Sequence, residues 1–259
     1  MKVNFAAIAI TAVVGTTPAF AGIETISDGI PAANSSLKVG VGVANSSNAY
    51  RGYDDRQSAI PLIQYDSENF YMDGLEIGYK AWEEQNHRVS LFLGAGGEEF
   101  DASKSNHLKS FDDRDMSIMA GTRYRYMDSW GILDAKIAFD VSDKSDGTVA
   151  SIGYGYPIQV SDRLTIMPRG FAKWMNNDYA NYYYGVSDNE AQSIGASAYA
   201  PGSSYKYGVE LAGAYRINNV WELSAGARLQ MLDSNIKDSP MISGDNETVI
   251  FTGVSYKFW

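Results

Sequence analysis

The chain has 259 residues, no cysteine and a formal net charge of −10 at pH 7. This acidic balance argues against nucleic acid as a partner, and the lack of cysteine excludes a disulfide framework. The 18 tyrosines, 25 glycines and 5 tryptophans favour strands with aromatic ends over a helical enzyme.

The N-terminus has the pattern of a cleavable secretory signal. Lys2 supplies a positive charge, residues 5–14 are apolar, and an A-x-A cleavage site ends at Ala21. The apolar stretch is too short to span a bilayer. A buried N-terminal helix is the alternative, but residues 15–18 (GTTP) break a helix where a signal should end.

Two regions follow from this pattern. We expect a cleavable signal peptide over residues 1–21, so that the protein is exported, and a periplasmic N-terminal segment over residues 22–36.

From residue 37 onward, apolar side chains alternate with polar or small ones, which is the signal of a β-strand. Most of these segments run eight to twelve residues, and a tilted strand needs about 9–11 residues to cross the hydrocarbon layer. Strands of a soluble sandwich are usually nearer 5–6 residues. The eleven segments are residues 37–44, 60–65, 75–82, 88–96, 116–126, 132–141, 148–156, 164–174, 205–216, 221–230 and 247–258.

The connections between these segments alternate in length. Those at residues 127–129, 157–162 and 217–219 are short, whereas those at residues 98–115, 175–204 and 233–247 are long and polar. Outer-membrane barrels have short periplasmic turns and long extracellular loops. The alternation therefore predicts a single outer-membrane β-barrel domain over residues 37–259, and its orientation. Together with the signal peptide, this places the protein in the cell outer membrane of a Gram-negative bacterium.

The number of strands depends on one dipeptide. A bacterial single-chain barrel has an even number of strands, and the apolar phase flips across Asp73-Gly74. This dipeptide is either a bulge or a tight turn. If it is a turn, residues 69–72 form an extra short strand. We predict an all-β, antiparallel transmembrane β-barrel of about twelve strands, with ten as the alternative.

The faces opposite the apolar ones would line the lumen, and they carry charges of both signs. These charges form either a network of ion pairs that fills the barrel or a polar channel with a selectivity field. Inward glycines such as Gly121 and Gly208 favour filling, because they let long side chains from opposite walls meet. The predicted lumen-facing charges are Glu76, Lys80, Arg88, Arg123, Arg125, Asp134, Lys136, Asp140, Arg169, Lys173, Lys206, Glu210, Arg216, Glu222 and Arg228.

The sequence motifs do not indicate an enzyme. Neither His87 nor His107 belongs to a pattern that specifies a catalytic triad, and no G-x-S-x-G is present. The glycines of residues 94–97 are interpreted as strand packing, since no helix follows to bind a phosphate. The acidic loop 98–115 is either a solvated rim or a site for a divalent cation. We expect no catalytic residue, no cofactor and no metal.

Two features lie in the longest loop. The aromatic run of residues 179–184 (YANYYY) is interpreted as the rim of an aromatic girdle, with a sugar- or partner-binding surface as the alternative. Next, Ser187 and Glu190 form a capping box, and Gly195 stops the helix about two turns later. We expect this short helix to pack on the barrel or inside its mouth, because it is too short to be stable alone.

The last predicted strand, residues 247–258, should close the barrel against residues 37–44. Its aromatic end suits a membrane interface. Tyr256, Phe258 and Trp259 form the candidate assembly signal that the outer-membrane insertion machinery would read.

Three blocks of sequence resemble those of the MipA/OmpV family. Residues 181–187 (NYYYGVS), with the small and aromatic residues that continue to Tyr199, match its most specific block. Residues 50–54 (YRGYD) with 61–65 (PLIQY), and residues 238–240 (DSP), are similar to two others. The resemblance covers nearly all of the chain after Ala21.

This resemblance implies an outer-membrane barrel in contact with membrane lipid and lipopolysaccharide. For one branch it implies a scaffold that joins a lytic transglycosylase to a bifunctional murein synthase in peptidoglycan remodelling. For the other branch of the family, the resemblance implies a porin-like channel or a surface-exposed binding or adhesion protein. The family offers no catalytic residues. Its barrels usually end in Tyr-x-Phe, and here Trp259 follows Phe258, which leaves open which ring is read.

Overall fold

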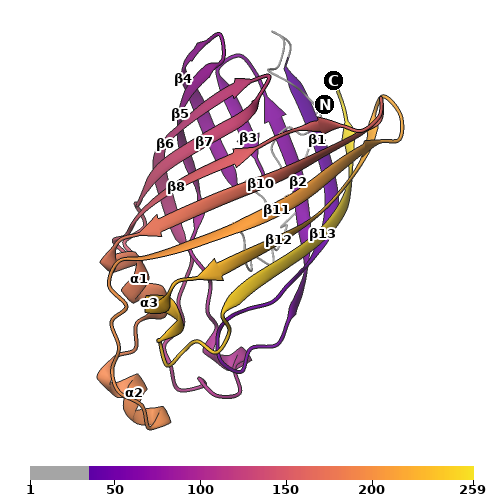
Figure 1. Cartoon of the computed structure of the whole chain (residues 1–259). Coiled ribbons are helices and arrows are strands. Elements are labelled where there is room, and N and C mark those ends of the chain that lie inside the picture. Colours follow the sequence, from indigo (N-terminus) through magenta and orange to yellow (C-terminus); the bar gives the residue numbers. More distant parts are fainter. Residues whose placement is uncertain (1–34) are drawn as a thin grey trace, which may run out of the picture.

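The computed structural model describes residues 35–259, and these form a closed barrel of twelve antiparallel strands (Figure 1). The predicted signal peptide and nearly all of the segment 22–36 lie outside the described residues. The strands are β1 (Ser36–Ser46), β2 (Arg56–Asp66), β3 (Phe70–Asp73), β4 (Glu76–Glu84), β5 (His87–Gly96), β6 (Ser117–Asp128), β7 (Gly131–Asp140), β8 (Thr148–Gly155), β10 (Leu164–Met175), β11 (Ser204–Arg216), β12 (Trp221–Leu232) and β13 (Asn246–Lys257).

Each strand pairs with its neighbour in the chain, and β13 closes the barrel on β1 as predicted. The two-residue β9 (Ile158–Gln159) extends the line of β8, because both pair with β10. Alternating side chains along ten-residue strands thus generate a wall whose two faces differ.

The two ends of the barrel are unlike each other. Short connections, the start of β1 and the end of β13 lie at one end, here called the turn end (Figure 1, top). The long connections lie at the other, the loop end. There the chain forms α1 (Asn177–Tyr184), α2 (Asp188–Ile194), α3 (Ser234–Lys237) and a 3₁₀ helix (Ala102–Lys104).

Helix α2 confirms the predicted short helix. The Ser187 side chain accepts a hydrogen bond from the Glu190 amide, and the Glu190 carboxylate accepts one from the Ser187 amide. Gly195 ends the helix with a φ of 68°, a conformation that glycine adopts without a steric penalty.

The strand count is twelve, because Asp73-Gly74 is a turn and not a bulge. Gly74 has a φ of +55°, and its amide donates to the Ile63 carbonyl at 2.8 Å. The chain reverses there into β4, so that β3 has only four residues. The alternative of ten strands is wrong.

The outer surface of the barrel is apolar. Val41, Leu211 and Ile250 are each more than half exposed. An apolar surface that covers a whole wall is unfavourable in water. Aromatic side chains form belts above and below this band, at the turn end (Trp82, Trp130, Tyr154, Trp221, Tyr256) and near the loop end (Trp174, Tyr205, Tyr207). This arrangement matches a bilayer with two interfaces. Among the described residues, the helices are all too short and polar to traverse a bilayer.

The largest apolar cluster closes the loop end of the barrel. We call it the loop-end cap; its fully buried side chains include Tyr50, Phe100, Leu108, Tyr179, Tyr183, Tyr184, Ile236 and Met241. The prediction that residues 179–184 form a girdle is therefore wrong. They form helix α1, and the rings of Tyr179, Tyr183 and Tyr184 are at most 1% exposed.

Candidate functional site

A first group of charges meets inside the barrel, between β4, β6, β7 and β10. The Glu76 carboxylate lies 2.9 Å from Arg123 and 2.7 Å from Lys136. The Asp134 carboxylate lies 3.3 Å from Arg125, 3.5 Å from Arg123 and 3.9 Å from Arg169. Because β4 and β7 are not neighbours in the sheet, the Glu76–Lys136 pair crosses the interior. We call Glu76, Arg123, Arg125, Asp134, Lys136 and Arg169 the central ion cluster.

A second group lies just beneath the loop-end cap. Lys206 has 0% of its side chain exposed, and its ammonium pairs with Glu98 and, at 2.8 Å, with Glu247. The Tyr184 hydroxyl donates to Glu98, and the Gln230 amide donates to Glu247 at 2.9 Å. These five residues form the loop-end ion cluster.

Glu98 is ionised in this setting. Burial alone would disfavour its charged form, but Lys206 and Lys173 outweigh that effect and lower the pKa of Glu98 to about 2. A buried carboxylate held charged in this way ties the cap to the barrel wall.

Further ion pairs line the wall. Arg228 and Glu210 are opposite each other on β12 and β11, and Arg228 donates to Glu210 at 2.6 Å. Toward the turn end, Lys38 pairs with Glu222 at 3.4 Å, Lys80 with Asp66 at 2.8 Å and Arg88 with Glu83 at 2.8 Å.

Three of the predicted lumen-facing charges lie near the ends of the barrel and outside the two clusters. Arg216 is exposed at the turn end and donates to the backbone carbonyl of Asp162. Asp140 lies at the loop end of β7, where it accepts hydrogen bonds from Ser142 and Ser145. Lys173 lies against the cap and donates to the Tyr179 hydroxyl at 3.3 Å.

Sequence reasoning missed several partners of the clustered charges, among them Glu98, Glu247 and Tyr71. Glu98 continues the inward face of β5 two residues beyond Gly96, and Glu247 shares the inward face of β13 with Phe251, so alternation alone could have found both. Tyr71, whose hydroxyl donates to Glu76 at 2.7 Å, became visible only once β3 was known to be a strand.

Paired charges therefore lie across the lumen, and aromatic rings pack together at its loop end. Opposite charges neutralise one another across the interior, and the cap covers the loop end. No set of three or more potential metal ligands gathers in residues 35–259. The arrangement suits a filled barrel that acts through its two ends.

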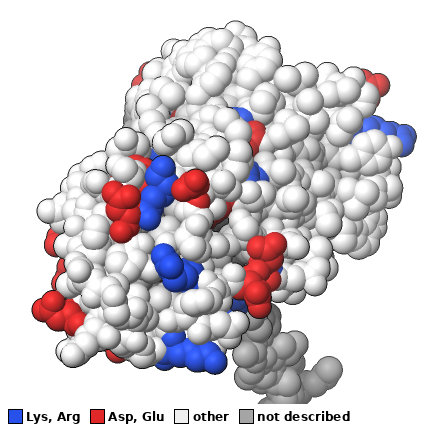
Figure 2. Space-filling model, turned by 60° about the horizontal axis from the view of Figure 1, so that its bottom comes forward, with Lys and Arg blue, Asp and Glu red and all other residues white. Residues whose placement is uncertain are grey.

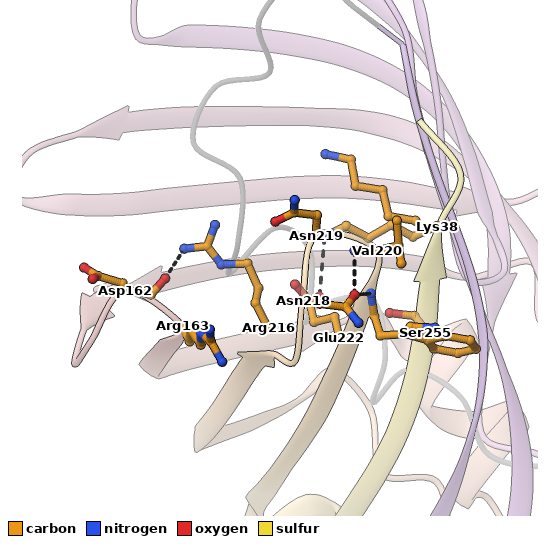
Figure 3. Close-up of a pocket in the computed structure, with 11 residues that line it drawn as sticks. Lys38, Asp162, Arg163, Arg216, Asn218, Asn219, Val220, Glu222 and Ser255 are labelled. Carbon is orange, nitrogen blue, oxygen red and sulfur yellow. Dashed lines mark hydrogen bonds and ion pairs between the residues drawn. The ribbon is translucent and has the colours of Figure 1, made fainter.

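A pocket of about 340 Å³ opens at the turn end, between β1, β13 and the β11–β12 turn (Figure 3). The Asn218 side chain shapes this turn, since it accepts hydrogen bonds from the amides of Val220 (3.0 Å) and Trp221 (2.9 Å). The charged residues that line the pocket are Lys38, Arg163, Arg216, Lys257, Asp162 and Glu222.

This turn-end pocket carries more cations than acids. Lys38 neutralises Glu222, while the guanidinium of Arg216 is directed at a backbone carbonyl and not at a carboxylate. Arg163 and Lys257 form no ion pair within the described chain. The remaining positive potential favours an anionic group as an occupant.

The opposite face has no such imbalance. Figure 2 looks toward the loop end, where basic and acidic side chains are interspersed on a mostly uncharged surface. Arg114 and Glu190 form a buried pair at 2.7 Å that fastens α2 to the loop between β5 and β6. The outward-facing end is thus an ordered surface and not a set of separate loops.

Sequence comparison finds relatives along nearly the whole barrel. The family described as MltA-interacting protein MipA matches residues 39–258. The putative outer membrane protein YiaT of Escherichia coli K12 is 31% identical over 86% of this chain and 92% of its own. The MltA-interacting protein of the same strain is 30% identical over 90% and 94%, and OmpV of Vibrio cholerae is 25% identical over 84% and 85%.

Comparison with solved structures returns outer-membrane proteins. An outer membrane channel from Pseudomonas putida F1 superposes with a TM-score of 0.45 at 11% identity, over 89% of this chain and 97% of its own. The NanC porin gives a TM-score of 0.42 at 11% identity, over 85% and 98%.

Proposed function

The chain belongs to the MipA family of outer membrane proteins, and from this premise we propose that it is a scaffold for murein enzymes. Its barrel would hold a lytic transglycosylase and a murein synthase together at the inner surface of the outer membrane. The turn end then faces the periplasm and the loop end faces the cell exterior. No step of catalysis is assigned to the barrel itself.

Two observations support this proposal. A relative that aligns with 90% of the chain carries the name MltA-interacting protein. In addition, the ion clusters and the cap occupy the interior, so the barrel offers its ends and not a channel as working surfaces.

The strongest structural support for the proposal is the turn-end pocket. Its excess of cations lies on the periplasmic side and is suited to acidic side chains or a carboxylate of a protein partner. A specific interface usually buries at least about 1,000 Å², which is more than the short turns offer. Residues 22–36 would supply further contact area.

The proposal predicts that charge reversal in the pocket weakens binding of the partner enzymes. The double variant Arg163→Glu/Lys257→Glu, in lipid nanodiscs, should bind a purified lytic transglycosylase and murein synthase at least about tenfold more weakly, which corresponds to about 1.4 kcal/mol. Biolayer interferometry measures the affinity, and a form lacking residues 22–36 tests the additional contact.

Lys109→Glu is the matched control, because Lys109 is exposed at the loop end and changes the net charge in the same direction. It should bind like the wild type. An equal loss of affinity in this control would mean that the net charge of the protein, and not the pocket, causes the effect. Failure of the wild type to bind either enzyme would refute the scaffold.

The alternative is a porin-like channel or a surface-exposed binding or adhesion protein. The ordered loop end with its exposed helix α2 favours the surface role over the channel. Binding of whole cells to host-surface glycans or proteins, compared between the wild type and a variant lacking residues 187–195, would distinguish that role from the scaffold.

A further inference from the structure

The turn-end pocket contains two pairs of like charges that lie opposite each other on neighbouring strands. Lys38 on β1 and Lys257 on β13 are direct partners in the register. Arg163 and Arg216 form the second pair, since the Arg216 amide donates to the Arg163 carbonyl at 2.8 Å. Like charges directly opposite each other in a sheet are destabilising. An anion bound between the two cations of a pair would remove this repulsion.

The acidic residues of the pocket neutralise only part of this positive charge. Glu222 pairs with Lys38 at 3.4 Å, whereas Asp162 forms no ion pair in residues 35–259. The lining has four basic and two acidic side chains, which leaves a formal charge of +2. An occupant with two negative charges would balance the pocket.

The Arg216 side chain is oriented so that it can bind an oxyanion. One of its terminal nitrogens donates to the backbone carbonyl of Asp162, and this bond fixes the position of the guanidinium beside the β11–β12 turn (Figure 3). A guanidinium has five N–H donors in a planar fork, and one carbonyl occupies only part of them. Such a fork binds a carboxylate or a phosphate through two parallel hydrogen bonds.

Two neutral polar side chains also line the pocket. Ser255 lies directly opposite Glu222 in the register of β12 and β13, and Asn219 lies in the β11–β12 turn. Among the residues that the structure describes, neither side chain has a hydrogen-bond partner. A hydroxyl and an amide can bind the N–H and C=O groups of a peptide, so the lining suits a peptide that carries carboxylates.

Membrane lipid lies on the other side of this part of the wall. Trp221 and Tyr256 are direct partners on β12 and β13, with ring centroids 5.1 Å apart, and they belong to the outer aromatic belt. Successive side chains of a strand point to opposite faces, so the neighbouring Glu222 and Lys257 face the interior. An anion therefore reaches these charges through the mouth of the barrel and not from the bilayer.

The pocket is concave and small. Its volume of about 340 Å³ is near the lower limit of small-molecule sites, which span about 300–1,000 Å³. The end of one extended chain fits such a space, whereas the surface of a folded domain does not enter it. A C-terminal end also supplies a carboxylate of its own. Together with one acidic side chain it carries two negative charges, equal to the excess positive charge of the pocket.

We propose that the turn-end pocket binds the C-terminal end of a partner protein, with an acidic residue at or next to the terminal position. Arg163 and Arg216 bind one carboxylate, and Lys257 with Lys38 binds the other. Ser255 bonds to the peptide group between them. This inference rests on the proposed function, because it specifies which part of a partner enzyme enters the pocket.

Synthetic peptides test the ligand class on the full-length barrel in lipid nanodiscs. The peptide GSGSGE with a free C-terminal carboxylate should bind about tenfold more tightly than the same peptide with a C-terminal amide. The amidated peptide GEGEGS, which has the same charge as the first peptide but no free end, should also bind weakly. Fluorescence anisotropy of an N-terminal label measures the three affinities. Equal affinity of GSGSGE and amidated GEGEGS would overturn recognition of a chain end.

Variants of the pocket test which side chains bind the peptide. Arg216→Gln and Lys257→Gln should each weaken binding of GSGSGE about tenfold. Arg216→Lys keeps the charge without the planar fork, so its loss should be intermediate. Lys109→Gln at the exposed loop end is the matched control and should bind like the wild type. An equal loss in this control would overturn the pocket as the site; heat-modifiable mobility in SDS gels confirms that each variant is folded.

Two other anions test the alternative occupants. Glycerol phosphate represents a lipid headgroup, and a soluble disaccharide tetrapeptide represents murein. If either displaces labelled GSGSGE at a lower concentration than unlabelled GSGSGE does, the pocket belongs to that ligand and the protein chain end is wrong. Binding of the murein enzymes is measured separately. A barrel that binds both enzymes but not GSGSGE would overturn this inference alone, whereas a barrel that binds GSGSGE but neither enzyme would refute the scaffold.

Discussion

A buried charge in the barrel interior is stable only together with its oppositely charged partners, and Lys206 is the clearest case. Its ammonium lies beneath the cap with Glu98 and Glu247 as partners. Transfer of one unpaired charge from water to such a place costs several kcal/mol. The three side chains therefore have to be considered as one unit whose loss affects both the wall and the cap.

Removing the cation of this unit should destabilise the barrel. Lys206→Met leaves two carboxylates buried without their main counter-ion, and we expect the free energy of unfolding to fall by about 3–5 kcal/mol. Urea unfolding in detergent micelles, followed by tryptophan fluorescence, measures it. Lys144→Met is the control, because Lys144 and its partner Asp115 are solvated and exposed pairs contribute little. Similar effects of both substitutions would contradict this account.

Glu98 should make the cap sensitive to acid. Its pKa is lowered from 4.5 to about 2 in the folded state, so its contribution to stability is complete above about pH 5. That contribution disappears as the pH falls from 4.5 toward 2. Near-ultraviolet circular dichroism of the buried tyrosines should therefore report loss of the cap in this window. Glu98→Gln should flatten the transition, and an unchanged acid profile in that variant would assign it to other groups.

At the scale of elements, strand alternation predicted most of the fold. All eleven sequence segments became strands, and the phase flip at Asp73-Gly74 correctly located β3. The partners of the charges could not be predicted, because they depend on how far each strand is staggered against its neighbours. Helix α1 was missed because tyrosines suit a membrane interface as well as a buried cap with hydroxyl partners.

The turn between β3 and β4 depends on glycine for its backbone conformation. A Cβ at Gly74 would meet no atom within 4 Å, and the same holds for Gly170 in β10, but only Gly74 has a positive φ of +55°. Gly74→Ala should therefore cost about 1–2 kcal/mol, while Gly170→Ala should be neutral or slightly stabilising. The temperature at which each variant loses its folded mobility in SDS gels compares their stabilities. Equal stability of the two variants would show that the positive φ at Gly74 does not require glycine.

The closing strand suggests which terminal ring directs assembly. The Phe258 amide still donates to the Leu37 carbonyl at 2.9 Å, whereas Trp259 lies beyond the paired strand. We therefore expect deletion of Trp259 to leave outer-membrane insertion intact and Phe258→Ala to reduce the amount of barrel in the membrane severalfold. Quantitative blots of membrane fractions measure this, and periplasmic degradation after loss of Trp259 alone would show that Trp259 is the ring read.

For the whole molecule, the structure separates three surfaces. The outer wall is apolar, the interior holds ion pairs, and the two ends differ in charge and order. A filled interior gives rigidity to the wall. Binding functions are then expected at the periplasmic pocket and on the extracellular surface.

Single-channel recording in a planar lipid bilayer tests the filled barrel most directly. Purified protein with its native loops should give a flat baseline at applied voltages of either sign, because the central and loop-end ion clusters and the cap occupy the interior. Large, steady openings of uniform conductance would show that the lumen conducts, and the protein would then be a channel and not a filled scaffold.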